Sequence, residues 1–499
     1  METATRFFNR IKFRVVVFLF GQNGRLLMCK SSNQVLGIPQ LENGWSLNQR
    51  IIVAKNTFIR GVGEDLLVWC PRSGASLVVN NARLLELALR GGPKRVEEII
   101  SCLSKHMNCS YNTVFEGYGE ILKELEKECL VEVLDEAGKR DNLDAAAKGS
   151  AAEDEADGDR LNVDADPIHE FYTTHHLPIE LHLDLTDACT ERCVHCYVPH
   201  EQNHFLPVES VEKALTEFRE MDGITVHLSG GEVMLHPDFE RICRKCVELN
   251  LNLIIMSNMT LADEKRIRFL KEIDPQVINV SVYSMKPEEH DAITQLPGSW
   301  SRTMKALELC DKHGILYRIA TPLLKENQTA FGELKKFADI HHVHLSTRAE
   351  IIAQSDHDCG NLAHVCSPEE LQNVLECNRE MFNENWIERM PSVDAKVCDI
   401  GEVRIYLNAK GDYYPCATMH GYVLGNIREN TMVEVWNGEK LNYLRGLKNS
   451  DFGVCASCEK RPWCKVCPAA NFNATGDLFR HHPGACALSG VIKKVYGGK

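Results

Sequence analysis

The sequence predicts an α/β protein: a partial (β/α)6 TIM barrel, preceded by a winged-helix-like β+α module and followed by a cysteine-rich extension. Three observations support this prediction. Between residues 177 and 386, apolar strand-like runs alternate with amphipathic helical segments, which is typical of parallel strands joined by helices. A β-rich stretch with three helical segments precedes this repeat, and paired cysteines follow it.

The composition of the whole chain bounds the class of protein. With 499 residues, of which 44% are hydrophobic, we expect roughly two to four domains with sizeable cores. The formal net charge of −14 argues against a nucleic-acid partner held by bulk electrostatics. No apolar run approaches the roughly 18 residues of a membrane span. The chain has 21 cysteines and no recognisable secretion signal, which indicates metal ligands and reduced thiols. We therefore expect a cytoplasmic protein without a membrane or nucleic-acid partner.

Residues 1–62 alternate short β-rich runs with turns and indicate no particular chemistry. Arg6–Arg14 followed by Val15–Phe20 has the order of a signal peptide, but its apolar run is short and no small-residue cleavage site follows. Residues 21–24, rich in Gly and Asn, instead predict the turn of a β-hairpin over residues 18–28.

Residues 63–134 predict a compact β+α module. Two strands at 65–70 and 75–79 flank a turn, three helices follow at 82–89, 96–106 and 113–128, and a strand closes the unit at 130–133. A small sheet with three helices is a winged-helix-like arrangement.

The run from Val68 to Val133 resembles the RiPP recognition element, the leader-binding domain related to the pyrroloquinoline quinone biosynthesis chaperone. The resemblance implies that an extended leader peptide adds as a strand to an exposed sheet edge. A DNA-binding winged helix and a structural cap are the alternatives. The acidic third helix, Glu120–Glu128, disfavours DNA because its carboxylates repel phosphates.

Residues 135–166 predict a flexible acidic linker. Its centre, Ala145–Asp159, is acidic, rich in small residues and without apolar periodicity, so it cannot bury a core. About thirty residues of such chain span an r.m.s. distance of about 30 Å, which is enough for the first module to dock in more than one place.

Residues 167–350 predict the barrel, and residues 351–397 a helical bridge. Strands are expected near 179–185, 224–229, 251–256, 276–283, 315–321 and 342–348, and helices near 208–221, 237–249, 262–272, 299–313, 330–340 and 368–386. Such barrels place their active sites at the carboxyl ends of the strands. Three polar motifs follow strands there: Leu228–Glu232, Met256–Thr260 and Ser281–Ser284.

A cysteine triplet with C-x3-C-x2-C spacing follows the first barrel strand: Cys189, Cys193 and Cys196. Three thiolates on one short loop can hold three irons of a 4Fe–4S cube and leave the fourth iron without a protein ligand. A zinc knuckle beside a glycine turn is the alternative.

The order of this triplet and the three strand-end motifs resembles the radical SAM enzymes, over about residues 170–350. The resemblance implies that Cys189, Cys193 and Cys196 hold a 4Fe–4S cluster, which reduces S-adenosylmethionine to a 5′-deoxyadenosyl radical. It also implies a set of cofactor contacts. His195 would lie against the adenine, Gly230, Gly231 and Glu232 would meet the methionine amine, Ser257 and Asn258 would contact the ribose, and Ser281 would belong to the same cofactor site.

Residues 398–499 carry seven cysteines in paired spacings: Cys398, Cys416, Cys455, Cys458, Cys464, Cys467 and Cys486. Such pairs could form one or two zinc ribbons. Their order resembles the SPASM extension of radical SAM peptide-modifying enzymes, which carries auxiliary 4Fe–4S clusters. The resemblance implies one cluster on Cys455, Cys458, Cys464 and Cys486, and part of another on Cys398, Cys416 and Cys467.

The second of these clusters lacks one protein thiolate. Its fourth iron is either open or ligated by an upstream cysteine such as Cys359, Cys366 or Cys377. The remaining cysteines, including the helical pair Cys243 and Cys246, fall mostly at apolar positions and are expected to be buried free thiols.

Together these features predict a cytoplasmic radical SAM/SPASM maturase of a ribosomally synthesised precursor peptide. The first module would bind the leader, and the barrel would form a thioether or carbon–carbon cross-link. A low-potential donor such as a flavodoxin or ferredoxin would supply electrons. One alternative is a formylglycine-forming enzyme of the sulfatase-maturase kind, and another is a non-catalytic iron–sulfur scaffold that binds peptide.

Overall fold

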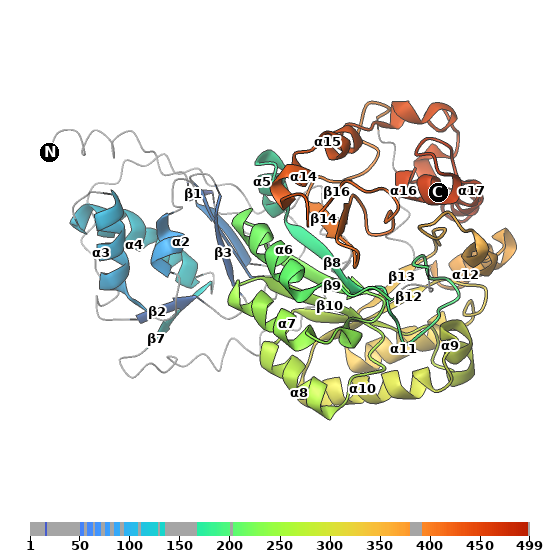
Figure 1. Ribbon diagram of the computed structural model, residues 1–499, viewed down its shortest axis with the longest axis horizontal. Coiled ribbons are helices and arrows are strands. Elements are labelled where there is room, and N and C mark those ends of the chain that lie inside the picture. Colours follow the sequence, from blue (N-terminus) through green and yellow to red (C-terminus); the bar gives the residue numbers. More distant parts are fainter. Residues whose placement is uncertain are drawn as a thin grey trace. The chain divides into compact units, whose positions relative to one another are not determined.

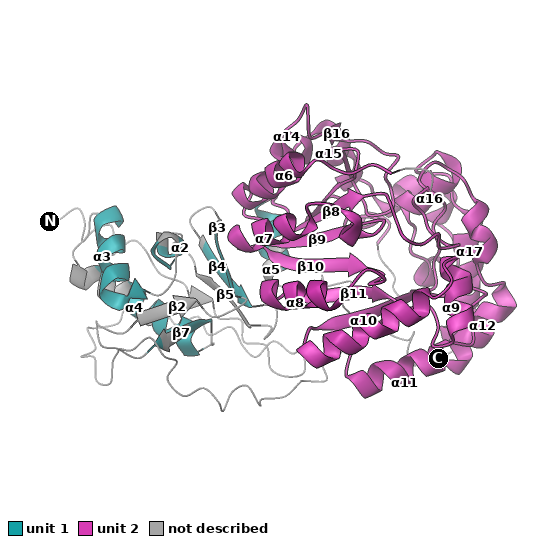
Figure 2. Cartoon of the chain, turned by 60° about the horizontal axis from the view of Figure 1, so that its bottom comes forward, with its two compact units in different colours: residues 1–156, 162–175 teal, residues 157–161, 176–499 magenta. Residues whose placement is uncertain are grey.

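The computed structural model describes residues 15–16, 50–53, 57–62, 65–70, 75–79, 84–89, 94–107, 111–127, 130–134, 167–199, 203–379 and 392–497. The chain divides into two compact units (Figure 2), with residues 1–156 and 162–175 in unit 1 and residues 157–161 and 176–499 in unit 2. The hairpin expected over residues 18–28 and the acidic linker lie outside the described residues.

The described residues of unit 1 form two antiparallel sheets and four helices. The first sheet has the order β1 (Val15–Val16), β5 (Ala75–Val79), β4 (Asp65–Cys70), β3 (Phe58–Val62). The second has the order β6 (Lys94–Arg95), β2 (Arg50–Val53), β7 (Val131–Leu134). The helices are α2 (Leu84–Leu89), α3 (Val96–Met107), α4 (Tyr111–Lys127) and α5 (Pro167–Thr174).

The strands and helices expected over residues 65–133 are confirmed, with ends that differ by a few residues. Helix α3 forms because its apolar residues recur at helical spacing, and it buries Val96, Ile99, Ile100 and Leu103. Strands on both sides of the expected boundary at residue 62 pair with each other: β3 with β4, and β2 with β7. Residues 50–53 and 58–62 are therefore part of this module's sheets.

Unit 2 is built on one nine-stranded sheet, in the order β13-β12-β11-β10-β9-β8-β14-β15-β16 (Figure 1). The parallel strands are β8 (Glu180–Thr186), β9 (Thr225–Gly230), β10 (Asn252–Ser257), β11 (Val277–Ser281), β12 (Tyr317–Pro322) and β13 (Leu345–Arg348). Each pairs in parallel with its neighbour in sequence. The six expected strands and their order in a partial barrel are confirmed.

Helices follow the strands as the repeat requires. They are α6 (Val208–Glu220), α7 (Phe239–Glu248), α8 (Glu264–Ile273), α9 (Pro287–Thr294), α10 (Ser299–His313), α11 (Phe331–His341) and α12 (Pro368–Cys377). Helix α9 was not expected from the sequence. It has only eight residues, too few to show a clear helical period.

The alternation of side chains along β8 separates the core from the barrel interior. Leu181, Leu183 and Leu185 are completely buried in the main hydrophobic cluster. The intervening side chains point to the other face. Each lies within 4 Å of a charged or titratable side chain: Glu180 of Arg404, His182 of Asp184, and Asp184 of His420. The barrel interior along this strand is therefore polar.

The C-terminal extension continues the barrel sheet, an arrangement that the sequence did not indicate. Strand β14 (Arg404–Leu407) pairs in parallel with β8, from Arg404↔Glu180 to Leu407↔Leu183. Strands β15 (Asp412–Tyr414) and β16 (Gly425–Asn426) follow in antiparallel order. This pairing brings the extension's cysteine region beside the first barrel strand.

Further helices complete the extension. They are α14 (Met432–Trp436), α15 (Glu439–Arg445), α16 (Pro468–Thr475) and α17 (Pro483–Tyr496). None of the described helices is both long and apolar enough to cross a membrane.

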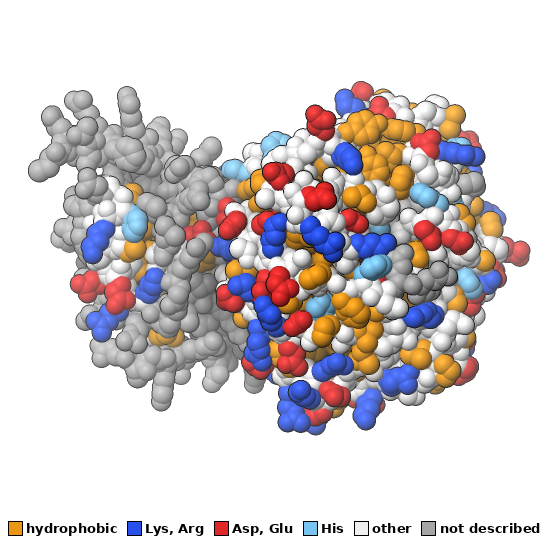
Figure 3. All heavy atoms as spheres, viewed as in Figure 1, with side chains coloured by type: hydrophobic (Ala, Val, Ile, Leu, Met, Phe, Trp, Pro, Cys, Tyr) orange, Lys and Arg blue, Asp and Glu red, His pale blue; other side chains and the backbone are white. Residues whose placement is uncertain are grey.

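The charged surface of unit 2 mixes both signs on the face that Figure 3 shows. Acidic and basic side chains interleave there. Ion pairs also join neighbouring helices of the unit: Arg241–Glu212 joins α7 to α6, and Arg244–Glu272 joins α7 to α8.

Candidate active site

The loop after β8 carries the cysteine triplet and is fixed at both its base and its middle. The Ala188 N–H donates to Thr186 Oγ1 at 3.0 Å, where the strand ends. Farther along, the Arg192 and Val194 N–H groups donate to the Thr294 and Ile293 carbonyls at 2.8 and 3.0 Å. These carbonyls belong to the C-terminal end of α9. The loop is therefore held by the backbone of neighbouring elements.

The three thiols of this loop lie close to one another. Burial raises the pKa of Cys193, and the charges of Glu191, Cys196 and Cys189 raise it further. Burial also raises the pKa of Cys189 to about 12, with a contribution from the charge of Cys196. None of the cysteines in the described residues forms a disulfide. Three neighbouring free thiols fit the ligand set of a three-cysteine 4Fe–4S cluster, whose irons would hold them as thiolates.

Glu191 is a buried carboxyl group in the same loop that the sequence analysis did not select. Its side chain is 2% exposed, and its Oε1 atom has no hydrogen-bond partner. Its Oε2 accepts from the Cys193 thiol at 3.3 Å. Burial raises the pKa of Glu191 to about 8. The signal for it was weak, because a charged residue between cysteines on a loop ordinarily faces solvent.

The Gly-Gly-Glu motif ends β9 directly against the base of the cysteine loop. The Gly231 and Glu232 N–H groups donate to the Thr186 and Ala188 carbonyls at 2.7 and 2.8 Å. A Cβ on Gly230 would lie 2.1 Å from Thr186 O, and one on Gly231 would lie 2.1 Å from Ala188 O. Gly230 also has φ of +126°. Only glycine fits this close approach of two backbones.

Ser257 and Asn258 lie at the end of β10, and their polar groups bond within the protein. Ser257 Oγ donates to the Glu232 carboxylate at 2.9 Å, and the Asn258 N–H donates to the same carboxylate at 2.9 Å. Asn258 Nδ2 donates to Thr190 Oγ1 on the cysteine loop at 2.9 Å. The ends of β9 and β10 are thus joined to the loop that carries the cysteines.

His195 and Ser281 belong to the same strand-end region. The His195 ring packs edge-on against Tyr283, with 5.0 Å between ring centroids. The Tyr283 hydroxyl lies 3.6 Å from Cys193 Sγ. Ser281 ends β11, directly before the segment that carries Tyr283. The fold therefore brings the predicted residues of all three strand-end motifs to one end of the barrel.

The charges that act on the C-terminal thiols link these cysteines in two groups. Burial raises the pKa of Cys455, and the charges of Cys464, Cys486 and Cys458 raise it further. Burial raises the pKa of Cys467 too, and Cys416 and Cys398 are among the charges that add to it. The family resemblance implies the same two groups as ligand sets, and these sets stay a prediction. In the parts of the chain that the structure describes, no group of His, Cys, Asp or Glu is arranged to hold a single metal ion.

The three cysteines considered for a fourth ligand lie in different surroundings. Cys359 is exposed, and its Sγ lies 3.9 Å from the Ala474 carbonyl near the end of α16. Cys366 is buried in a hydrophobic cluster between α12 and α17, and Cys377 is exposed at the end of α12. The charge of Glu350 also acts on the Cys467 thiol. It is the largest cause, next to burial, that raises the pKa of Cys467.

A row of rings connects the residue after Cys196 to the segment that contains Cys416. Tyr197, directly after Cys196, packs edge-on against His420 with ring centroids 5.7 Å apart. His420 packs against Tyr414 at 4.4 Å. The Tyr414 hydroxyl donates to Asp184 at 2.7 Å. Tyr197 therefore lies between the first cysteine loop and the region of Cys416.

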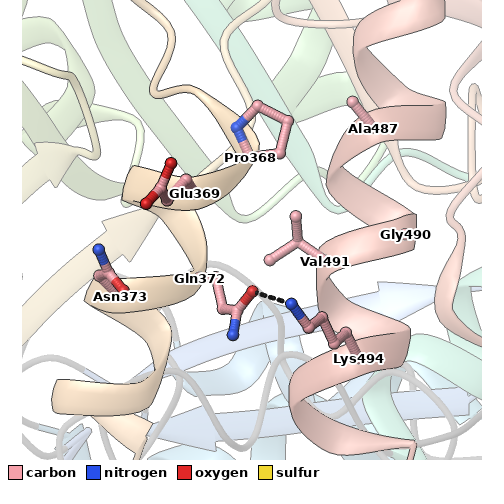
Figure 4. Close-up of a pocket in the computed structure, with 8 residues that line it drawn as sticks. All are labelled: Pro368, Glu369, Gln372, Asn373, Ala487, Gly490, Val491 and Lys494. Carbon is pink, nitrogen blue, oxygen red and sulfur yellow. Dashed lines mark hydrogen bonds between the residues drawn. The ribbon is translucent and has the colours of Figure 1, made fainter.

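A groove of about 610 Å³ lies elsewhere in unit 2, between α12 and α17 (Figure 4). Lys494 reaches across it and donates to Gln372 Oε1 at 2.6 Å. Its remaining lining residues are Pro368, Glu369, Asn373, Ala487, Gly490 and Val491. None of them is a predicted site residue, so we locate the chemistry at the barrel end and not in this groove.

A partial barrel with a three-cysteine loop at the carboxyl end of its first strand, extended by two further cysteine sets, defines a radical SAM type of enzyme. Residues 183–338 match the family model of the Radical SAM superfamily, and residues 398–468 match the SPASM iron–sulfur cluster-binding domain. The chain therefore contains a Radical SAM domain and a SPASM domain. The first domain implies a 4Fe–4S cluster and S-adenosylmethionine, and the second implies auxiliary iron–sulfur clusters.

Several named proteins are similar to this chain. The AdoMet-dependent heme synthase of Methanosarcina barkeri is 24% identical over 335 residues, covering 60% of this chain and 94% of the synthase. The subtilosin biosynthesis protein AlbA of Bacillus subtilis is 22% identical over 325 residues, covering 62% of this chain and 71% of AlbA. The crystal structure of Streptococcus suis SuiB bound to precursor peptide SuiA has a TM-score of 0.56 and 15% identity, covering 86% of this chain and 99% of SuiB.

Proposed function

We propose that this radical SAM/SPASM enzyme is a maturase of a ribosomally synthesised precursor peptide. In this proposal it installs a thioether or carbon–carbon cross-link. One observation carries the proposal: a separate β+α unit with two antiparallel sheets precedes the catalytic unit. The likeness to SuiB covers 86% of this chain and therefore extends beyond unit 2 into that unit. AlbA, a bacteriocin biosynthesis protein, supports the same class of substrate.

Unit 1 would bind the leader of the precursor by strand addition. Antiparallel sheets recognise extended peptides through backbone hydrogen bonds at an outer strand. The module used for this binding would include residues 50–62, because β2 and β3 supply strands to its two sheets. The linker between the units would let the leader-bound module deliver different parts of the core peptide to the barrel end.

The catalytic unit would hold the cofactors at the barrel end. Cys189, Cys193 and Cys196 would hold the radical SAM cluster, which supplies the 5′-deoxyadenosyl radical from S-adenosylmethionine when loaded. His195 would lie against the adenine, and the backbone at Gly230 and Gly231 would face the methionine amine. The polar interior formed by β8 would receive the reacting residue of the peptide.

The extension would supply two auxiliary clusters. Cys455, Cys458, Cys464 and Cys486 would hold one of them, and Cys398, Cys416 and Cys467 part of the other. Cross-link formation releases one electron and one proton from the peptide after hydrogen abstraction. The set that includes Cys416 would take that electron. Tyr197, which follows Cys196, supports this route because its ring packs against His420, four residues after Cys416. A low-potential flavodoxin or ferredoxin would reduce the radical SAM cluster.

The test is anaerobic co-expression with a small precursor peptide encoded beside this chain, followed by mass spectrometry of the peptide. We expect a mass loss equal to two hydrogens for each cross-link, and none with an enzyme in which Cys189, Cys193 and Cys196 are replaced by Ala. Formylglycine formation from cysteine would instead remove the sulfur. An unmodified peptide bound by an enzyme that does not cleave S-adenosylmethionine would favour the scaffold alternative.

A further inference from the structure

Glu232 is the centre of a buried hydrogen-bond network at the barrel end. Its side chain is completely buried, and its two carboxylate oxygens accept four contacts from the protein. The Met234 N–H donates to Oε1 at 3.0 Å, Ser257 Oγ lies 2.9 and 3.0 Å from the two oxygens, and the Asn258 N–H donates to Oε2 at 2.9 Å. The carboxylate therefore fixes the backbone and side chains of the neighbouring strand end.

Asn258 extends this network to the cysteine loop, and both ends of its amide have partners. Oδ1 accepts from the Thr260 N–H at 3.0 Å and from Thr260 Oγ1 at 2.7 Å. Nδ2 donates to Thr190 Oγ1 at 2.9 Å and lies 3.8 Å from Cys189 Sγ. Because the oxygen end is held by Thr260, the N–H groups are aimed at the cysteine loop. The side chain is 6% exposed, so water does not compete for these bonds.

We propose that Asn258 is a positioning residue for the radical SAM cluster, which orients Cys189 and stabilises the reduced cluster by donating an N–H to the Cys189 sulfur. Glu232 acts one step farther away, by holding Ser257 and Asn258 in place. The inference rests on the proposed role of Cys189 as a cluster ligand. A thiolate bound to iron accepts a hydrogen bond more strongly than a thiol does. Hydrogen bonds to cluster sulfurs raise the reduction potential, because the reduced cluster carries one more negative charge.

This role differs from a contact between Asn258 and the ribose of S-adenosylmethionine. A ribose contact would need a free donor or acceptor on the Asn258 amide, whereas the structure gives partners to both of its ends. The two roles predict different changes. Loss of a cluster-positioning bond changes the potential, whereas loss of a ribose contact changes the affinity for S-adenosylmethionine.

The experiment compares Asn258→Asp and Asn258→Ala with a matched control, Asn252→Asp. Asn258→Asp keeps the size and the acceptor but removes both N–H donors. Asn252 lies at the other end of β10, is 4% exposed, and donates from its amide to Thr225 at 3.2 Å and to Gln276. Thr260→Val is a milder variant, which removes the hydroxyl donor to the Asn258 amide oxygen while keeping the side-chain volume.

The readouts are iron content, the potential of the S-adenosylmethionine-responsive EPR signal in a redox titration, and the affinity for S-adenosylmethionine. We expect a lower potential in both Asn258 variants, a smaller shift in the same direction in Thr260→Val, and the wild-type potential in Asn252→Asp. Affinity for S-adenosylmethionine should stay unchanged in all four proteins. A ribose contact would instead appear as a roughly fivefold loss of affinity.

Two results would overturn the inference. The first is a wild-type potential in folded, iron-loaded Asn258→Asp or Thr260→Val, and the second is weakened binding of S-adenosylmethionine without a shift in potential. If the wild-type enzyme itself lacked an EPR signal that responds to S-adenosylmethionine, the ligand assignment of Cys189 would fail instead. Should Asn258→Asp not fold, Thr260→Val alone decides the outcome.

Discussion

The Tyr414 hydroxyl donates to Asp184 at 2.7 Å, and this buried bond joins the C-terminal extension to the first strand of the barrel. Both side chains are nearly inaccessible to water. Since Tyr414 lies two residues before Cys416, the bond fixes the start of an auxiliary cysteine region relative to the barrel interior. His420 adds a second contact, with its Nε2 3.4 Å from the same carboxylate oxygen.

Replacing Tyr414 by Phe should destabilise the enzyme, because it leaves the buried Asp184 carboxylate without its hydroxyl donor. Loss of a hydrogen bond to a charged group typically costs about 1.5–3 kcal/mol. Tyr413 is a matched control on the same strand, since its buried hydroxyl has no hydrogen-bond partner. Urea midpoints of the reconstituted proteins should therefore fall for Tyr414→Phe and stay unchanged for Tyr413→Phe. Equal midpoints for the two variants would contradict the structural role of the Asp184 bond.

The ion pair between Arg404 and Glu180 should behave as a buried pair. Arg404 Nε lies 2.7 Å from Glu180 Oε2, across the β14–β8 pairing. Burial alone would raise the pKa of Glu180, but Arg404 and His227 lower it, so the group is ionised. Arg404→Met should cost about 3 kcal/mol because it leaves the buried carboxylate without its guanidinium partner and with His227 alone beside it. Adding Glu180→Gln should recover much of that loss in urea unfolding, and a double variant less stable than Arg404→Met would refute this account.

The Gly-Gly pair offers a test of the backbone packing at the barrel end. Gly231→Ala should displace the cysteine loop, because the new Cβ would meet Ala188 O at 2.1 Å and Asp187 O at 2.8 Å. We expect less iron in the radical SAM cluster and loss of S-adenosylmethionine cleavage. Gly332→Ala in α11 is the control, since nothing lies within 4 Å of its Cβ position. Wild-type cluster content in Gly231→Ala would show that the loop tolerates the displacement.

The cysteine sets predict which cluster each substitution removes. An enzyme with Cys189, Cys193 and Cys196 replaced by Ala should lose S-adenosylmethionine cleavage and keep auxiliary cluster absorbance. An enzyme without the seven C-terminal cysteines should contain clearly less iron and sulfide than the wild type. Iron and sulfide assays after anaerobic reconstitution measure both outcomes. Equal iron contents in the wild type and the seven-cysteine variant would rule out auxiliary clusters.

The sequence was sufficient to predict the strands of the barrel, but not the strand pairing that joins the extension to it. Each barrel strand is a short apolar run before a polar motif, so its existence and its active end follow from local pattern. The partner of β14 does not, because Arg404–Leu407 contains no signal for the strand that pairs with it, and that strand, β8, is more than 200 residues earlier. The pairing depends on tertiary packing and on the Arg404–Glu180 ion pair.

The candidate site, like the fold, could be predicted from the sequence only in part. Cysteine spacing together with the family resemblance was enough to predict ligand sets, and these sets stay a prediction. The contacts of Asn258 were not accessible, because they require the ends of β9, β10 and the cysteine loop to meet. Glu191 was missed for a related reason: its burial is produced by neighbouring loops and is not apparent from its own sequence context.

The last prediction concerns the separation of leader binding from chemistry. The chain divides into two compact units, so deleting residues 1–160 should leave an enzyme that holds its clusters and cleaves S-adenosylmethionine unproductively. It should lose most modification of a full-length precursor, because the leader no longer raises the local concentration of the core peptide. The complementary fragment is residues 1–136, which keeps β2 and β3 with their partners and should bind a leader peptide alone. Mass spectrometry of the precursor and fluorescence titration of the leader measure the two halves of this prediction. A soluble truncated enzyme that modifies its precursor at the wild-type rate would refute leader binding by unit 1, whereas an insoluble one would indicate that unit 1 is a structural cap.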